Sequence, residues 1–228
     1  MSTLGDLERE IVSCRLCPRL VAWREEVARV KRASFAGEEY WGRPLPAFGD
    51  PRATVVVLGL APAAHGGNRT GRIFTGDRSG DWLFAALHRA GFANQPVSRA
   101  LDDGLELTGC WVTAAVRCAP PANRPSPTER DTCLPYAARE LELLEHARVV
   151  VALGGFAWDA ALRIFVEGGA VLPRPRPRFG HGAEVRVGGF TLLGCFHPSQ
   201  QNTFTGRLTE PMMDDVFARA RELSRRCE

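Results

Sequence analysis

Four of the seven cysteines in this 228-residue chain have the spacing of metal ligands. Cys14 and Cys17 form a C-R-L-C pair near the start, and Cys118 and Cys133 follow far downstream. A C-x-x-C pair can present two thiolates to one metal centre from a single turn, and both zinc and iron–sulfur clusters accept four thiolates. The spacing therefore predicts one shared metal site without deciding between zinc and a cluster, and four unconnected thiols are the alternative.

The other three cysteines are expected to be inert. Cys110 and Cys195 lie in apolar, strand-like runs, where a free cysteine behaves as a small core residue, and Cys227 lies in the C-terminal tail. We expect a cytoplasmic protein without a disulfide framework, because the first residues are acidic rather than the basic start of a signal peptide. The longest apolar run, residues 55–64, is too short to cross a bilayer, so no membrane association is expected.

An alternation of strands and helices must position the candidate ligands. Apolar, β-branched runs predict buried strands at Thr54–Leu60, Cys110–Val116, Arg148–Leu153 and Phe190–Cys195. Helical spacing predicts helices at Leu7–Ile11, Leu20–Lys31, Ser79–Ala90, Pro127–His146, Phe156–Phe165 and Pro211–Arg225. This order favours an α/β fold, a three-layer sandwich with a central four-stranded parallel sheet, to which a metal site ties the N-terminal helices. The proline-rich segment Val171–Val187 predicts a loop or a short hairpin.

Three polar loops follow the predicted strands and should meet at one edge of the sheet. Gly59–Asp77 follows the first strand, Arg117–Arg124 the second and His197–Arg207 the fourth. Open α/β sheets bind ligands at the carboxyl ends of their strands.

A 45% hydrophobic, 24% charged composition is typical of one globular domain, here residues 1–228. The net charge of +3 permits nucleic-acid binding without requiring it.

Several motifs in this order resemble the family-five (b-type) uracil-DNA glycosylases of bacteria and archaea, over nearly the whole chain. They are C-R-L-C-P-R-L-V-A-W-R-E-E-V, F-G-D-P, G-L-A-P-A-A-H-G-G-N-R-T-G-R-I-F-T-G-D, T-A-A-V-R-C-A-P-P-A-N-R-P, V-A-L-G and Q-N-T-F-T-G-R-L-T. The resemblance implies the glycosylase α/β fold and a [4Fe–4S] cluster on Cys14, Cys17, Cys118 and Cys133. It also implies excision of uracil and other deaminated or modified bases from double- or single-stranded DNA by hydrolysis of the N-glycosidic bond. A monomer is the default expectation.

The chain departs from related glycosylases at positions near the expected chemistry. Ala63 stands where the family usually has Gly, and its methyl group could narrow the pocket. The best-known branch of the superfamily has a carboxylate where this chain has Ala61, and reads uracil with an Asn on the second strand, where Thr113 lies here. Family five shares the last two absences, so other residues or water must do both jobs.

Two residues are the candidates for catalysis. His197 ends the fourth strand, and a donor fixed there could stabilise the negative charge that develops on the departing uracil. Asp77 is the carboxylate nearest the first motif, where it could orient water or stabilise a cationic sugar. An alternative for Asp77 is the N-cap of the following helix.

The base is expected to contact Gly59, Ala61, His65, Phe74 and Asn123. Enzymes that act on a base flip it out of the stack and sandwich it, a role that Phe74 could fill. Asn123 offers an amide that matches the edge of uracil, although an Asn between two prolines is also a common turn residue.

DNA contacts are expected from the loop after His197 and from scattered arginines. Gln201 takes the place of the wedge that fills the gap left by a flipped base, with Phe204 or Leu208 sharing that job. The other expected contacts, mainly to phosphates, are Arg69, Arg124, Ser199 and Arg207, with sequence-independent support from Arg174–Arg178.

Three alternatives come from other functional classes. A non-catalytic iron–sulfur or zinc DNA-binding module would need no base-sized pocket. An electron-transfer protein would need a reversible potential and no affinity for DNA. A nucleotide-processing enzyme is disfavoured because the first loop lacks the Lys of a P-loop and a G-x-G-x-x-G motif.

Overall fold

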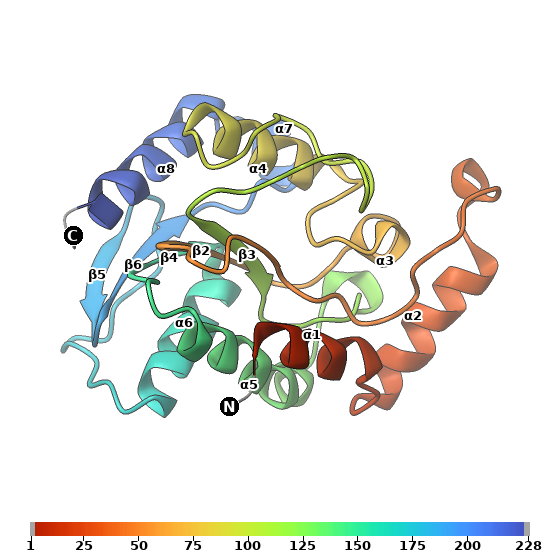
Figure 1. Cartoon of the computed structure of the whole chain (residues 1–228), viewed down its shortest axis with the longest axis horizontal. Helices are drawn as coiled ribbons and strands as arrows, with labels where there is room; N and C mark the ends of the chain where they lie inside the picture. Colours follow the sequence, from red (N-terminus) through yellow and green to blue (C-terminus); the bar gives the residue numbers. More distant parts are fainter. Residues whose placement is uncertain (1–2, 226–228) are drawn as a thin grey trace.

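A computed structural model describes residues 3–225 and has a six-stranded sheet as its central layer, in the order β1-β3-β2-β4-β6-β5 (Figure 1). The four inner strands run parallel to one another, as predicted. They are β2 (Val55–Gly59), β3 (Cys110–Ala114), β4 (Val149–Leu153) and β6 (Phe190–Cys195). Every residue of β2, β3 and β4 is buried, because helices cover both faces of the sheet.

The prediction of a four-stranded sheet is incomplete, because a short antiparallel strand lies at each edge. β1 (Phe48–Gly49) pairs with β3, and β5 (Glu184–Val187) pairs with β6. Two residues are too few to show a periodic pattern, so nothing in the sequence indicated β1. The proline-rich segment Val171–Val187, predicted to be a loop or a short hairpin, is a loop up to residue 183 and ends in β5, which forms a hairpin with β6.

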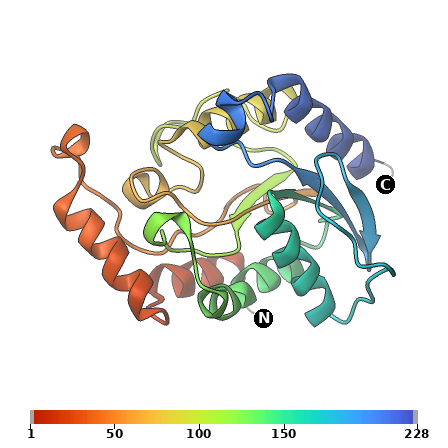
Figure 2. The same cartoon turned by 180° about the vertical axis from the view of Figure 1, so that it is seen from behind.

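Two layers of helices enclose the sheet (Figures 1 and 2). α4 (Arg78–Arg89) and α8 (Glu210–Arg225) cover one face around Leu83, Phe84 and Phe217. α5 (Pro127–Leu143) and α6 (Gly155–Glu167) cover the other face around Trp158 and Leu162. The expected capping box at the start of α5 is present, since Ser126 and Glu129 each accept a backbone N–H of the other.

Two N-terminal helices form a third packing unit beside α5. α1 (Leu4–Ser13) contributes Leu7 and Ile11, and α2 (Pro18–Val30) contributes Leu20, to an apolar cluster with Val116 and Tyr136. This cluster also contains the four candidate ligand cysteines. Cys110 and Cys195 are fully buried in the main core, as expected, and Cys227 lies outside the described residues.

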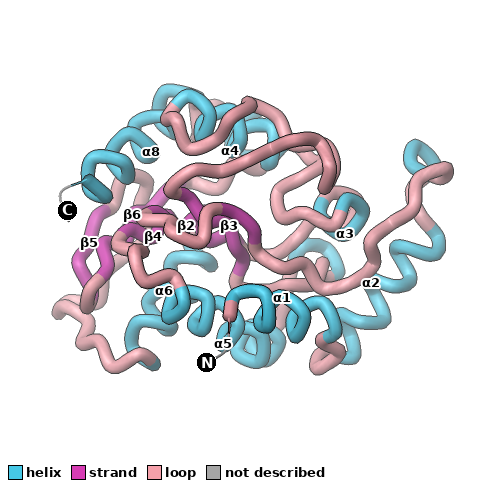
Figure 3. Tube along the Cα trace, in the orientation of Figure 1, coloured by secondary structure: helices cyan, strands magenta, loops and turns pink. Residues whose placement is uncertain are grey.

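The strand order gathers the loops of interest at one end of the sheet. From β2 the chain crosses to β3 on one side and then returns to β4 on the other. This reversal opens a crevice at the carboxyl ends of the strands. Three short helices lie in the segments that follow β2, β3 and β6, which Figure 3 draws mainly as loops: α3 (Gly67–Thr70), η2 (Pro121–Asn123) and α7 (Gln200–Phe204). Another short turn, η1 (Ala33–Phe35), follows α2.

None of the helices described here combines the length and the apolar character needed to cross a membrane.

Candidate active site at the carboxyl edge of the sheet

The ring of Phe74 lies over the end of β2. A Cβ atom placed on Gly59 would come within 2.6 Å of the Phe74 ring, so only glycine lets the ring approach this closely. Phe74 itself has a positive φ of 56°, which is rare for a bulky residue and typical of ligand-binding sites. Its side chain is buried in the core that faces α4, so the core interpretation is confirmed, and stacking on a base stays a prediction.

His197 follows β6 and reaches the same place. Its ring centroid lies 6.1 Å from that of Phe74, with the two planes inclined by 35°. Burial lowers the pKa of His197 to about 4, because an imidazolium would lose its hydration there. The imidazole is therefore neutral at physiological pH and can donate only one ring N–H.

Asp77 caps helix α4, and its carboxylate also faces the loop after β2. Its Oδ1 accepts the backbone N–H of Gly80 at 3.0 Å. A Cβ atom on Gly66 would lie 2.4 Å from Oδ2 of Asp77. Burial raises the pKa of Asp77 despite the capping N–H groups that favour its charged form. The alternative N-cap role is thus present, and the second oxygen lies against the motif loop.

His65 and Arg69 belong to a network that holds the motif loop. Nδ1 of His65 lies 3.0 Å from the Tyr40 hydroxyl, and burial together with the neighbouring arginines lowers the pKa of His65. Arg69 donates to the His65 carbonyl, pairs with Glu38, and lies over the Phe35 ring. The Arg69 side chain is only 12% exposed, which favours a structural role over the expected DNA contact.

Asn123 and Ala61 have different surroundings. Asn123 is exposed in η2, where Asn123 and Ala122 both have a positive φ near 50–55°. Asn tolerates this conformation, so its turn role is present, and base contact stays a prediction. Ala61 is partly buried and packs against the cluster that holds the cysteines.

The segment after His197 is anchored at its start and exposed along its length. Ser199 caps α7 by accepting the Asn202 backbone N–H, while Gln201 and Arg207 are exposed. Phe204 is 66% exposed, with the Arg78 guanidinium 4.6 Å from its ring centroid. The suggestion that Leu208 shares the wedge role is wrong, because Leu208 is fully buried in the core.

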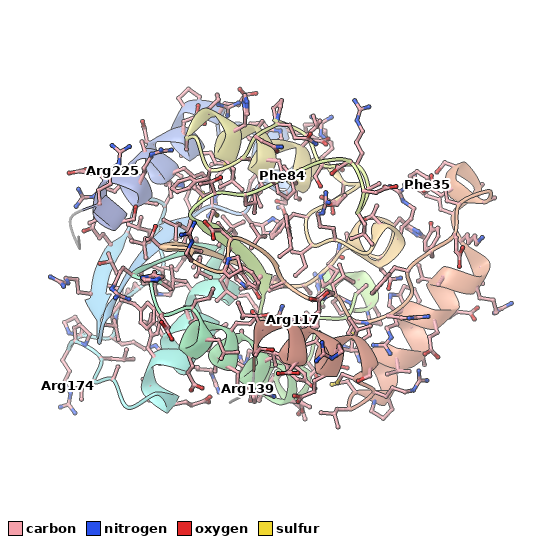
Figure 4. The ribbon with its side chains drawn as sticks, in the orientation of Figure 1. Phe35, Phe84, Arg117, Arg139, Arg174 and Arg225 are labelled. Atoms are coloured by element: carbon pink, nitrogen blue, oxygen red, sulfur yellow. The ribbon has the colours of Figure 1, made fainter. Side chains whose placement is uncertain are left out.

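The arginines of the proline-rich segment lie at the periphery. Arg174 and Arg178 are exposed, Arg176 is paired with Asp159, and Figure 4 shows Arg174 at an outer corner of the molecule. Arg124 is also exposed. These positions are accessible to a phosphate backbone.

The four candidate ligand cysteines line one cavity between α2, α5 and the loop after β3. Cys118 and Cys133 are buried, and burial raises the pKa values of their thiols to about 11 and about 12. Cys14 and Cys17 are partly buried. In residues 3–225, no three His, Cys, Asp or Glu side chains lie close enough together to hold a single metal ion.

Two N–H donors face sulfur atoms of this cavity. The guanidinium of Arg24 donates to Sγ of Cys118 at 2.9 Å, and the backbone N–H of Arg117 donates to Sγ of Cys133 at 3.3 Å. Arg24 is 2% exposed, and its Nε has no hydrogen-bond partner. A buried cation requires nearby negative charge, so the donor set fits thiolates that ligate a metal centre.

Comparisons with known proteins agree with this geometry. The model of the uracil DNA glycosylase superfamily matches residues 46–221. A type-5 uracil-DNA glycosylase of Mycobacterium tuberculosis (strain CDC 1551 / Oshkosh) is 58% identical over 224 residues, 97% of this chain and 82% of that protein. The chain belongs to the uracil-DNA glycosylase superfamily, in its type-5 branch. A type-5 enzyme of Thermus thermophilus is 52% identical, covering 94% of this chain and 95% of its own, and one of Pyrobaculum aerophilum is 45% identical, covering 94% and 91%.

The departures expected within the uracil-DNA glycosylases have structural counterparts here. The Thr113 hydroxyl donates to Glu140 at 2.6 Å inside the protein, so it is already engaged. Arg117 pairs with the same carboxylate at 2.6 Å, and Figure 4 labels it in the interior. Asp77 is the one carboxylate among the predicted site residues of this family member, and its Oδ2 lies against the motif loop.

Sequence reasoning missed several residues that hold this glycosylase site together. His181 accepts the backbone N–H of Phe196, next to His197, and its other ring nitrogen lies 3.2 Å from the Met212 carbonyl. Tyr40 and Arg24 were missed as well. Only tertiary packing brings these residues to the site, and the one local signal was the G-H-G turn around His181.

Proposed function

We propose that this protein is a DNA repair glycosylase that excises uracil by hydrolysing the N-glycosidic bond and leaves an abasic site. The observation that supports this proposal most strongly is that neutral His197, Phe74 and the loop that contains Asp77 meet at one edge of the sheet, in a type-5 chain. The non-catalytic binding module is not favoured, because such a module needs neither a buried neutral imidazole nor a strained aromatic residue beside it.

His197 acts on the leaving group. When the bond between the sugar C1′ and the base nitrogen breaks, both bonding electrons stay on uracil and its O2 gains negative charge. A neutral imidazole donates its N–H to that oxygen, and the interaction strengthens as charge develops. Burial excludes competing water and keeps the imidazole neutral, so its strength as a hydrogen-bond donor does not vary near neutral pH.

Asp77 acts on the sugar side. Its carboxylate orients a water molecule, whose oxygen forms the new bond to C1′ while one proton passes to the carboxylate. The raised pKa of Asp77 makes it a stronger base than an exposed aspartate, although it must be ionised to accept the proton. The departing uracil anion later takes up a proton from solvent.

The remaining site residues bind the extruded nucleotide. Phe74 stacks on the base above Gly59, and His65, Ala61 and Asn123 line its approach. Gln201 and Phe204 on α7 occupy the space that the base leaves in the duplex. The partly buried Ser199 and the exposed Arg207 and Arg124 contact phosphates, while Arg69 supports the loop from inside. We expect the protein to act as a single-domain monomer on double- and single-stranded DNA.

A [4Fe–4S] cluster is the proposed occupant of the cysteine cavity. Support comes from four thiols around one cavity and from two N–H donors directed at their sulfur atoms. Cys14, Cys17, Cys118 and Cys133 would hold the cluster, which would supply cross-links between α1, α2 and α5 rather than electrons. Hydrolysis of a glycosidic bond transfers no electrons, so this role is structural.

A cleavage assay tests the proposal. Labelled duplexes carrying uracil, hypoxanthine or ethenocytosine are incubated with protein whose iron and sulfide contents are known, and alkali then breaks the strand at abasic sites. Strand breaks at uracil that are lost in His197→Gln support the proposal, and breaks at the other two bases support a broad substrate range. Specific binding without breaks, from protein with its iron intact, would favour the non-catalytic module.

A further inference from the structure

Arg24 connects the cysteine cavity to helix α2 from inside the protein. Its guanidinium donates to Sγ of Cys118 at 2.9 Å and to the Cys14 carbonyl at 3.2 Å. In the described part of the chain, the carboxylate within 4.0 Å of this guanidinium is that of Glu25, which is exposed and already bonded twice to Arg15. The sulfur atoms would balance the buried charge of Arg24 if the proposed cluster held them as thiolates.

Asn68 connects the same helix residue to the active-site loop. Asn68 is fully buried in α3, and its Nδ2 donates to the Arg24 backbone carbonyl at 3.2 Å and towards the Ala64 carbonyl at 3.5 Å. Its Oδ1 has no partner. If the amide were flipped, Oδ1 would face two carbonyl oxygens and could form no hydrogen bond with either. The Nδ2 group is therefore the one that faces these carbonyls.

The segment around Asn68 carries the residues proposed to act on DNA. The Ala63 carbonyl accepts the Asn68 backbone N–H at 3.1 Å, and Gly66, two residues before Asn68, lies against the Asp77 carboxylate. Arg69, the next residue, donates to the carbonyls of His65 and Gly76. A shift of Asn68 would therefore move both His65 and the surroundings of Asp77.

We propose that Arg24 and Asn68 are positioning residues through which the metal site fixes the active-site loop, residues 63–77. In this proposal the ligated thiolates fix the Arg24 side chain and thereby this part of α2. The backbone carbonyl of Arg24 then accepts the hydrogen bond from Asn68, which fixes the loop. The inference rests on the proposed function and cofactor, and it gives a reason for a hydrolase to depend on a cluster that transfers no electrons.

Asn68→Ala tests the connection without touching a proposed metal ligand or substrate contact. We expect the variant to purify with wild-type iron content and visible absorbance. Loss of a buried hydrogen bond should increase amide hydrogen exchange in residues 63–77 about tenfold. Iron release to excess chelator should also become faster, because coupling between two sites acts in both directions. The kcat for uracil excision should fall about tenfold with little change in KM.

Ser224→Ala is the matched control, since Ser224 is buried in α8 and donates to the Arg221 carbonyl far from both sites along the chain. The proposal is overturned if Asn68→Ala matches this control in loop exchange and in iron release. Both readouts need no DNA, so they remain decisive even if no base is excised. Iron-free wild-type protein would overturn the inference together with the proposed cofactor.

Arg24→Lys supplies a second, milder variant. Lysine keeps the positive charge but cannot reach two acceptors with a planar fork. We expect faster iron release and faster loop exchange from this change as well. If both residues act through one connection, Arg24→Lys combined with Asn68→Ala should change loop exchange less than the sum of the single changes. Strict additivity would show two independent effects and reject the connection.

Discussion

His197 illustrates how a single partly buried residue links chemistry to stability. His197→Gln should lower kcat by roughly 100- to 1000-fold, the usual effect of removing a donor that stabilises developing negative charge. Uracil excision under single-turnover conditions measures this loss. Activity near the wild-type level would show that the imidazole is only structural.

The same substitution predicts a change in pH-dependent stability. The folded pKa of His197, about 4, lies below the ordinary value of 6.5, so the unfolded chain binds the extra proton first. Wild-type protein should therefore lose stability as pH falls from 6.5 towards 4, by about 3 kcal/mol more than His197→Gln. Urea unfolding of both proteins across this range tests the sign, and other titrating groups cancel because both proteins share them. Parallel curves would contradict the burial argument.

Asp77 should show a trade-off between activity and stability. Its folded pKa is raised, so the charged form is disfavoured in the fold at neutral pH. Asn caps helices as well as Asp does, and carries no charge to bury. Asp77→Asn should therefore unfold at the same or a higher temperature, while excision falls at least about 100-fold.

Ser126→Asn, at the N-cap of α5, is the control for Asp77→Asn and should leave excision unchanged. If Asp77→Asn retained normal activity, the role of Asp77 would be limited to capping helix α4. Within the wild type, excision should decline on the acid side as Asp77 takes up its proton.

At the scale of elements, α7 presents one large aromatic side chain to solvent. Phe204→Ala should weaken productive binding of uracil in a duplex about tenfold, because loss of base stacking costs roughly 1–3 kcal/mol. Single-stranded substrate needs no wedge and should change less than twofold. The melting temperature should not move, since Phe204 is 66% exposed.

Val171→Ala, at another highly exposed apolar residue, is the control for Phe204→Ala and should affect neither substrate. Equal losses on both substrates would place Phe204 outside the wedge. Leu208→Ala, by contrast, should cost about 2–5 kcal/mol of stability because its side chain is fully buried.

The elements also show what the sequence could and could not predict. The four parallel strands and the Ser126–Glu129 capping box were predictable, because β-branched runs and cap residues leave local patterns. β1 was not predictable, since two residues carry no period. Leu208 was misassigned for a related reason: a leucine in a polar loop gives no local indication of whether it points into the core.

The candidate site was predictable only in part. His197, Phe74 and Asp77 lie in motifs and converge as the parallel topology requires. Arg24 reads as a surface residue of an amphipathic helix, yet it is one of the largest fully buried side chains. Its guanidinium is buried against Cys118, which lies far away in the sequence, and no local pattern records such a contact.

For the whole molecule, the cysteine cavity predicts joint loss of stability and activity. Cys118→Ala should lose iron, lower the melting temperature and reduce excision, because the proposed cluster on Cys118 would join the loop after β3 to α1 and α2. Iron content, thermal unfolding and excision are measured on the same preparation.

Cys110→Ala is the control for Cys118→Ala. Cys110 is fully buried in β3 and does not line the cavity, so its substitution should retain iron and excision. Full activity of Cys118→Ala without bound iron would refute the structural role of the cluster.

The short antiparallel strands at the two sheet edges affect the tendency of the protein to aggregate. β3 and β6 would otherwise expose unpaired backbone groups along five or six residues, and such edges recruit strands from other chains. β1 pairs with two residues of β3, and β5 pairs with four residues of β6, so the outermost strands are only two and four residues long. β5 also alternates charged and apolar residues, with Glu184 and Arg186 separated by Val185. Short edge strands of this kind offer another chain little backbone to pair with, so we expect β1 and β5 to disfavour aggregation.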